Sequence, residues 1–169
     1  IIHPDPRLKK LAMPISEVTP TIERLAEDML ETMYDAPGIG LAAPQIGVMS
    51  RLFVMDCVKE EGAAAAPMVL LNPCITWASE ALSTYEEGCL SIPDSFIEIE
   101  RPKICEIEYV DMNGEIKNLR CDGLLSTCIQ HEINHLDGKL IIDNLSKLKR
   151  DMIIKKISKS KKNPDRIIV

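Results

Sequence analysis

Residues 130–138 read QHEINHLDG and contain two histidines four positions apart, with a glutamate directly after the first. On an α-helix, positions i and i+4 lie on one face, one turn apart, so both imidazoles can reach the same metal ion. Glu132 lies beside them and can take a proton from a metal-bound water. Two of the three histidines in the chain have this spacing. We therefore expect a metal site that includes His131 and His135.

The residues around this motif are typical of a helix spanning about residues 122–138. Asp122 is a suitable N-cap, and Gly138 is a natural C-terminal stop. Apolar residues recur between them at helical spacing. These are Leu124, Leu125, Cys128 and Ile129.

A catalytic metal site usually has three protein ligands and one open position, so a third ligand is needed. Two known patterns do not fit. A third histidine six residues after the second would fall on Ile141, and no glutamate follows Glu132. His3, near the terminus, is a weak candidate. The remaining candidates are aspartates and the six cysteines.

The spacing of Cys128 argues against it as a ligand. It lies seven residues before His135, about 10 Å along a helix axis, and metal–ligand bonds of about 2.0–2.3 Å cannot close over that span. We interpret Cys128 as a wall of the site. Other cysteines lie in apolar runs that predict buried packing. These are Cys57, Cys105 and Cys121.

Cys89 differs from the other cysteines. It lies in residues 85–93, YEEGCLSIP, where a glycine precedes it and a proline ends the segment. This pattern predicts a loop that can present both a side chain and backbone N–H groups. Residue chemistry alone favours Cys89 only moderately over an aspartate as the third ligand.

Three segments together resemble the peptide deformylase family: residues 38–45 (GIGLAAPQ), residues 87–91 (EGCLS) and the histidine motif. They occur in the family's order, and the opening HPDPRL at residues 3–8 is similar as well. The resemblance implies Cys89 as the third ligand. One position departs from the family's pattern. Asn134 stands where the family usually has aspartate, which affects an interaction behind the ligands and not the ligands themselves.

The resemblance also implies an activity, namely removal of the N-formyl group from N-formylmethionyl nascent peptides with release of formate. Glu132 would act as general base and then general acid. The Gln45 side chain and the Leu90 backbone N–H would stabilise the oxyanion. Substrate would bind in an apolar pocket for methionine and along a glycine-rich strand edge. The residues expected to bind substrate are Gly38, Ile39, Gly40, Tyr85, Glu87, Gly88, Thr127 and Cys128.

The expected cofactor is one divalent metal ion. Two histidines and a cysteine suit zinc by ligand softness. The family has similar ligands but typically works with ferrous iron. The resemblance therefore implies Fe²⁺ in the cell, and Zn²⁺, Ni²⁺ or Co²⁺ can replace it in a purified sample.

Two other functions fit parts of the pattern. A generic HExxH metallopeptidase would cut internal amide bonds with the same ligands and the same glutamate. A structural metal site in a nucleic-acid-binding module would account for the basic C-terminal end. Structural sites generally use four ligands, and Glu132 stands at the general-base position, so the second alternative fits less well.

The length predicts one domain over residues 1–169. The order of helix and strand patterns predicts an α+β fold, with antiparallel strands wrapped around the histidine helix and a C-terminal helix. Hydrophobic content of 46% and charged content of 27% are typical of a globular protein. No apolar run is long enough to cross a membrane, and no signal-peptide pattern is present. A thiolate ligand favours a reducing compartment, so we expect a cytoplasmic protein, and we expect a monomer.

The C-terminal end, residues 146–169, is predicted to be a basic helix and tail. It holds nine Lys and Arg against two Asp, in a chain whose net charge is −6. Such an end can contact ribosomal RNA near the emerging nascent chain, as the corresponding helix does in similar deformylases. It can equally be a solvated helix face.

Two segments lack a helix or strand pattern. The glycine-rich residues 38–47 predict a loop that lets the backbone approach another chain closely. They lack the Lys-Ser/Thr ending of a phosphate-binding loop. Residues 59–67, with four consecutive alanines, predict a surface insertion.

The other elements follow from apolar periodicity and turn residues. Thr19 before Pro20 predicts the start of a helix that runs to Tyr34. Asn113-Gly114 predicts a hairpin turn. Strands are expected at residues 51–58, 68–71, 74–82, 96–100, 104–110, 115–121 and 140–142, and a last helix at residues 145–159.

Overall fold

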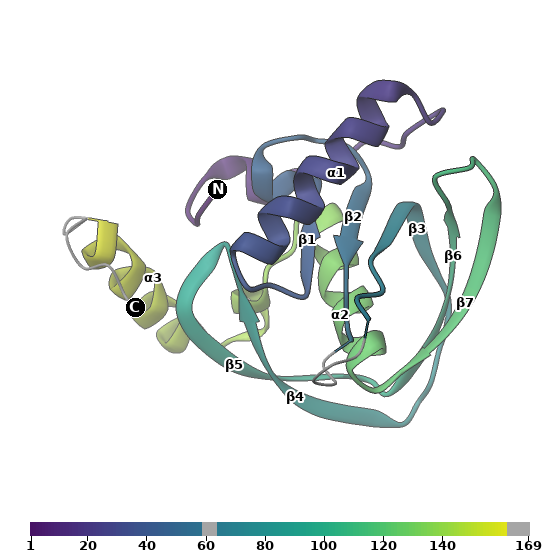
Figure 1. Ribbon diagram of the computed structural model, residues 1–169. Coiled ribbons are helices and arrows are strands. Elements are labelled where there is room, and N and C mark those ends of the chain that lie inside the picture. Colours follow the sequence, from purple (N-terminus) through teal and green to yellow (C-terminus); the bar gives the residue numbers. More distant parts are fainter. Residues whose placement is uncertain (59–63, 162–169) are drawn as a thin grey trace.

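The computed structural model describes residues 1–58 and 64–161 and has an α+β architecture (Figure 1). The helices are α1 (Pro20–Asp35), α2 (Gly123–Leu136) and α3 (Lys147–Lys161), with short 3₁₀ helices at Pro6–Lys9, Ala43–Ile46 and Ile141–Asn144. The strands are β1 (Gly40–Ala42), β2 (Leu52–Met55), β3 (Met68–Ala78), β4 (Leu82–Cys89), β5 (Ile92–Pro102), β6 (Ile104–Val110) and β7 (Ile116–Asp122).

The strands of the described residues form two antiparallel sheets. One has five strands in the order β1-β2-β3-β6-β7, and the other is the β4–β5 ribbon. The predicted hairpin is confirmed, because β6 and β7 pair from Ile104 with Asp122 to Val110 with Ile116. Gly114 in its turn has a positive φ of 78°, a conformation that glycine adopts without strain.

The histidine helix α2 lies at the centre of the fold, as predicted (Figure 1). It contacts β1, β2, β6 and β7 of the large sheet and β5 of the ribbon. Its apolar side chains Ile129 and Leu136 are fully buried in a cluster that includes Phe53 and Leu70. Because both sheets cover it, the helix is buried on nearly all sides.

Helix α1 covers the large sheet at β1 and β2. It begins as predicted, with Thr19 at the N-cap accepting a hydrogen bond from the Ile22 N–H and Pro20 in the first turn. Met29 and Met33 are fully buried and pack in a cluster with Leu52 and other side chains of the sheet. The predicted core-facing helix is therefore confirmed.

Strand β3 differs from the prediction of two strands at residues 68–71 and 74–82. It is one strand, and its register with β6 shifts between Leu71 and Cys74. Asn72 lies in the shifted part with a φ of 50°, and its side-chain amide bonds to both the N–H and the carbonyl of Ile15. The Asn72 side chain thus bonds to a segment distant in the sequence, at the point where the register of β3 shifts.

Two further segments differ from their predicted form. The expected strand at residues 140–142 is a 3₁₀ turn, because the Asp143 carboxylate accepts the Leu140 N–H at 2.8 Å. The expected loop at residues 85–93 is a tight hairpin, in which β4 ends at Cys89 and β5 begins at Ile92. Of the expected insertion, residues 59–63 lie outside the described part of the chain.

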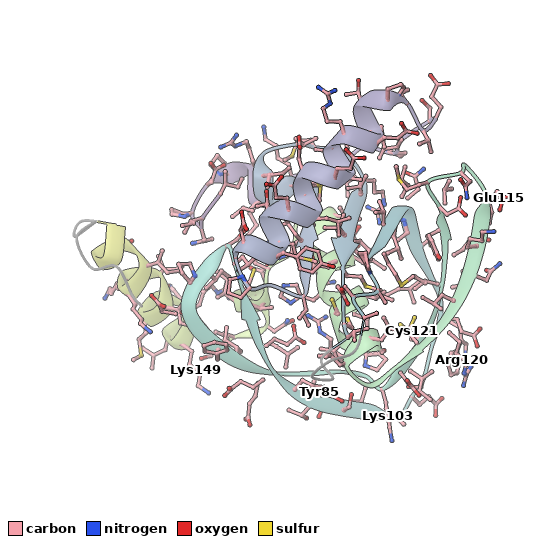
Figure 2. The ribbon with its side chains drawn as sticks, in the orientation of Figure 1. Tyr85, Lys103, Glu115, Arg120, Cys121 and Lys149 are labelled. Atoms are coloured by element: carbon pink, nitrogen blue, oxygen red, sulfur yellow. The ribbon has the colours of Figure 1, made fainter. Side chains whose placement is uncertain are left out.

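The C-terminal helix α3 packs on the β4–β5 ribbon. Its Ile153 and Ile157 join a cluster that includes Ile97 and Ile99 of β5. Figure 2 places Lys149 of α3 on the opposite side of the molecule from Glu115 at the tip of the β6–β7 hairpin. Among the described residues, no helix is both long and apolar enough to cross a membrane.

Candidate active site

Three potential metal ligands meet between the ribbon and the central helix. One ligand atom each from Cys89, His131 and His135 lies within 4.8 Å of the others. Cys89 Sγ lies 3.2 Å from His135 Nε2, and the two imidazole rings have centroids 5.0 Å apart. Of the candidate third ligands in the described residues, Cys89 is the one that joins both histidines.

The strand geometry of β4 explains how Cys89 reaches the helix. Side chains two apart on a strand point to the same face, so Glu87 and Cys89 both face α2 and are buried. Gly88 between them points to the other face, where Phe96 of the paired strand lies against it. A Cβ at residue 88 would lie 2.9 Å from the Phe96 ring.

Glu87 supports a metal ligand directly. Its Oε2 lies 2.8 Å from Nδ1 of His131, and Arg101 pairs with the same carboxylate through Nε at 2.5 Å and Nη2 at 2.9 Å. Burial alone would raise the pKa of Glu87, but the hydrogen bonds from Arg101 and His131 outweigh it and lower the pKa. Glu87 is therefore ionised behind His131 and turns that ring's other nitrogen towards Cys89.

The electrostatics of the two histidines suit a metal cation. Burial lowers the pKa of His135 well below its ordinary value, so the ring is neutral and has a free lone pair. Burial also acts to lower the pKa of His131, but hydrogen bonds with Cys89 and Glu87 raise it to about 10. Surroundings that favour a proton on His131 also favour a divalent cation in its place. The residues present thus fit a metal site of two imidazoles and one thiolate.

Glu132 stands beside the ligands with its carboxylate buried. Within the described part of the chain, its Oε2 has no hydrogen-bond partner. Burial raises the pKa of Glu132 to about 7. A buried carboxylate with this pKa can accept and release a proton near neutral pH.

Gln45 is held with its amide nitrogen towards the site. Its Oε1 accepts the Ala42 N–H at 2.8 Å, which fixes the orientation of the side chain. Its Nε2 then lies 3.2 Å from Ser91 Oγ and 3.8 Å from Cys89 Sγ. The glycine-rich segment predicted as a loop is β1 followed by a 3₁₀ turn, and this turn carries Gln45.

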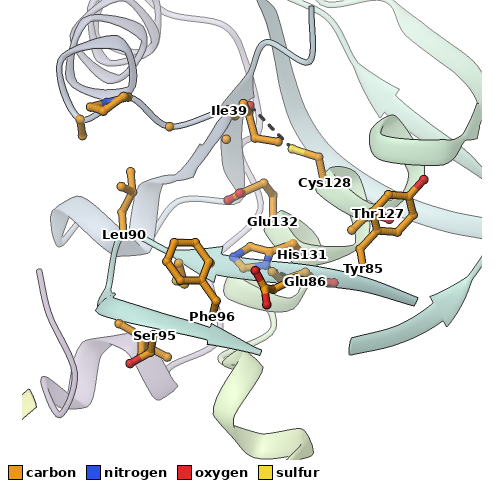
Figure 3. Close-up of a pocket in the computed structure, with 18 of the residues that line it drawn as sticks. Ile39, Tyr85, Glu86, Leu90, Ser95, Phe96, Thr127, Cys128, His131 and Glu132 are labelled. Carbon is orange, nitrogen blue, oxygen red and sulfur yellow. Dashed lines mark hydrogen bonds and ion pairs between the residues drawn. The ribbon is translucent and has the colours of Figure 1, made fainter. Parts of the chain in front are cut away.

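A cavity of about 730 Å³ opens over these groups. In Figure 3, Leu90 and Phe96 lie at one side of it, Tyr85 and Thr127 at the other, and His131 and Glu132 between them. All the predicted site residues other than His135 line this cavity. They are Gly38, Ile39, Gly40, Gln45, Tyr85, Glu87, Gly88, Cys89, Leu90, Thr127, Cys128, His131 and Glu132.

Several residues of the site were not predicted from the sequence. Phe96 and Leu124 line the cavity, and Arg101 lies behind it. Leu124 had a signal, because it lies one helical turn before Thr127 and Cys128 on the same helix. Phe96 and Arg101 had none, because only the pairing of β5 with β4 brings them to the site.

Comparisons with known proteins show the family of the chain. The family model described as polypeptide deformylase matches residues 1–151. The peptide deformylase of Rhizobium meliloti is 55% identical over 162 residues, which cover 96% of this chain and 92% of that protein. That of Pelagibacter ubique is 54% identical over 169 residues, 100% of this chain and 96% of that protein.

Solved structures show the same likeness. The crystal structure of peptide deformylase from Ehrlichia chaffeensis superposes with a TM-score of 0.93 at 36% identity, covering 97% of this chain and 96% of that one. The same enzyme in complex with actinonin gives a TM-score of 0.90 at 39% identity, covering 96% of this chain and 95% of that one. The chain therefore belongs to the peptide deformylase family, the hydrolases that remove the N-formyl group from nascent peptides.

Proposed function

We propose that this chain deformylates N-formylmethionyl nascent peptides with one divalent metal ion held by Cys89, His131 and His135. The observation that carries the proposal is the convergence of these three donors within 4.8 Å, beside the buried carboxylate of Glu132. When bound, the metal ion acidifies water and polarises the formyl oxygen. The metal expected in the cell is Fe²⁺, with Zn²⁺, Ni²⁺ or Co²⁺ able to replace it. Metal analysis of anaerobically purified protein tests this assignment.

Glu132 is the general base in this mechanism. It accepts a proton from the water that attacks the formyl carbon and then delivers a proton to the leaving amine. Its free carboxylate and its pKa of about 7 suit both steps. Formate and a peptide with a free amino terminus are the products.

The oxyanion that develops on the formyl oxygen needs hydrogen-bond donors. We assign this role to the Gln45 amide and the Leu90 backbone N–H. The Ala42 N–H holds Gln45 in place, so its amide is oriented before substrate arrives. Removing one such donor typically lowers the rate by about 100–1000-fold.

The substrate's methionine side chain fits the apolar end of the cavity, formed by Ile39, Tyr85, Thr127 and Cys128. An extended peptide can add its backbone to β1, which is an edge strand of the large sheet. Glycines at residues 38 and 40 permit that close approach. In this arrangement Gly88, on β4, would contact the substrate. Glu87 would contribute by holding the ligand His131 in place.

A direct test compares formyl-Met-Ala with acetyl-Met-Ala as substrates. We expect rapid hydrolysis of the formyl peptide and very slow hydrolysis of the acetyl peptide. The generic metallopeptidase predicted as an alternative would accept larger acyl groups. Comparable turnover of the two peptides would therefore contradict the deformylase assignment.

We further propose that the basic C-terminal helix contacts the ribosome. Helix α3 uses Ile153 and Ile157 to pack on the ribbon, and this leaves Lys147, Lys149 and Lys155 exposed. Replacing these three lysines with glutamate should weaken ribosome binding and reduce its dependence on salt. Unchanged binding would favour a solvated helix face. We place the protein in the cytoplasm, where nascent chains emerge and thiols stay reduced. We also propose that it is a monomer, which light scattering can test.

A further inference from the structure

The metal ligand His131 stands at one end of a chain of polar contacts that returns to its own helix. His131 Nδ1 contacts Glu87, and Arg101 holds Glu87 with two hydrogen bonds. The remaining guanidinium nitrogen of Arg101, Nη1, donates to Oδ1 of Asn134 at 2.8 Å. Asn134 directly precedes the ligand His135. The chain of contacts therefore ties helix α2 to the ribbon that carries Cys89.

Chemistry determines the orientation of the Asn134 side chain. A guanidinium group has only donors, so the amide must turn its oxygen to Arg101. The Arg101 and Glu87 side chains are 9% and 5% exposed, which leaves little water to replace a lost partner. Without the amide oxygen, a nearly buried donor of Arg101 would be unsatisfied.

We propose that Asn134 is a positioning residue for the metal site. Its amide oxygen holds Arg101, Arg101 holds Glu87, and Glu87 orients the His131 ring towards Cys89. The contribution of Asn134 is the acceptor oxygen.

Two variants separate this role from a general structural one. Asn134→Ala removes the acceptor, whereas Asn134→Asp keeps an oxygen at the same place. Metal-depleted proteins would be titrated with Co²⁺ against a chromophoric chelator, and the melting temperature of each metal-depleted protein would be measured. Asn144→Ala, at an exposed position outside the chain of contacts, is the matched control.

We expect Asn134→Ala to weaken Co²⁺ binding by about tenfold, as the loss of a partner behind a metal ligand does. Asn134→Asp should restore most of the affinity, and Asn144→Ala should match the wild-type chain. The visible spectrum of the Co²⁺ protein should change in Asn134→Ala, because the His131 ring is less constrained. Metal-depleted Asn134→Ala should melt at a somewhat lower temperature than the wild-type chain, because it leaves the Arg101 donor unsatisfied, and metal-depleted Asn134→Asp should not show this loss.

Several results would overturn the proposal. One is unchanged Co²⁺ affinity in Asn134→Ala, whether or not its melting temperature falls. Another is an Asn134→Asp protein as impaired as Asn134→Ala, because the acceptor oxygen would then not be the important feature. The inference rests on the proposed metal site. A wild-type chain that fails to bind Co²⁺ would overturn both, whereas the variant results bear on Asn134 alone.

Discussion

The backbone of Gly40 lies directly against the carboxylate of Glu132. A Cβ atom at residue 40 would lie 2.4 Å from Glu132 Oε1 and 3.0 Å from Cys128 Sγ. The first distance is far below van der Waals contact, so a side chain here forces the carboxylate to move. Gly40 therefore leaves room for the Glu132 carboxylate, the proposed general base, in addition to its proposed role in the approach of substrate.

Gly40→Ala should lower kcat/KM by about 100-fold, because a displacement of about 1 Å at a catalytic group can have that effect. Steady-state kinetics with a formylated peptide measures it. Gly114→Ala is the matched control, because a Cβ at that turn meets nothing within 4 Å. The control should lose some stability, since its φ is +78°, and keep its kcat/KM. Equal kcat/KM in both variants would contradict the role given to Gly40.

Glu132→Gln should bind metal normally and lose hydrolysis. The amide has nearly the same shape as the carboxylate but cannot take a proton at neutral pH, and general-base catalysis typically contributes about 10²–10⁴-fold. Metal content and formate release would be measured on the same preparation. Retained activity with full metal content would refute the assignment of Glu132 as the base.

Gly138→Ala should destabilise the fold without acting on the chemistry. Gly138 has a φ of +69°, and a Cβ there would lie 2.6 Å from the carbonyl oxygen of Lys9. Positive φ alone typically costs about 1–3 kcal/mol for a non-glycine residue. Urea denaturation should show at least this loss in the free energy of unfolding. A variant as stable as the wild-type chain would contradict both expected costs, that of the positive φ and that of the contact with Lys9.

Tyr34→Phe should make the free energy of unfolding depend less on pH in the acidic range. The Tyr34 hydroxyl donates a hydrogen bond to Asp56 at 2.7 Å, and this bond is the main cause of the lowered pKa of Asp56. Burial acts to raise that pKa, and hydrogen bonds from the backbone N–H groups of Val58 and Ala66 lower it further. A carboxyl group whose pKa is lowered by folding stabilises the fold at pH values above its ordinary pKa of 3.8. This stabilisation is lost as the pH falls through the pKa that Asp56 has in the folded chain.

At pH 7 the Tyr34→Phe variant should therefore be less stable by about 1 kcal/mol. The difference from the wild-type chain should shrink as the pH falls below 3.8. Urea denaturation at several pH values measures both. In an Asp56→Asn background the same substitution should have no pH-dependent effect. A constant difference at all pH values would show that Asp56 is not the group responsible.

Local sequence patterns predict the central helix and the two proposed metal ligands that lie on it. The spacing of His131 and His135 and the stop at Gly138 are properties of one helix, so they are visible in a short stretch of sequence. Cys89 needed the resemblance to the family, because its distance from the histidines depends on how the ribbon packs on α2. The sequence around Cys89 does not indicate that β4 and β5 pack against α2.

Other features depend on pairing between distant strands. Arg101 reaches Glu87 only because β5 runs antiparallel to β4, and their register places Phe96 over Gly88. The predicted strand at residues 140–142 failed because a side-chain contact from Asp143 decides the local turn. Apolar periodicity does not report such contacts.

The proposed metal-dependent deformylation is tested by measuring formate release from formyl-Met-Ala before chelation, after chelation and after metal is returned. Removal of the metal should abolish release, and Fe²⁺ or Co²⁺ should restore it in the wild-type chain. Cys89→Ala should regain little activity, because one of the three donors is missing. Full activity in demonstrably metal-free protein would contradict a metal site at Cys89, His131 and His135 as the catalytic centre.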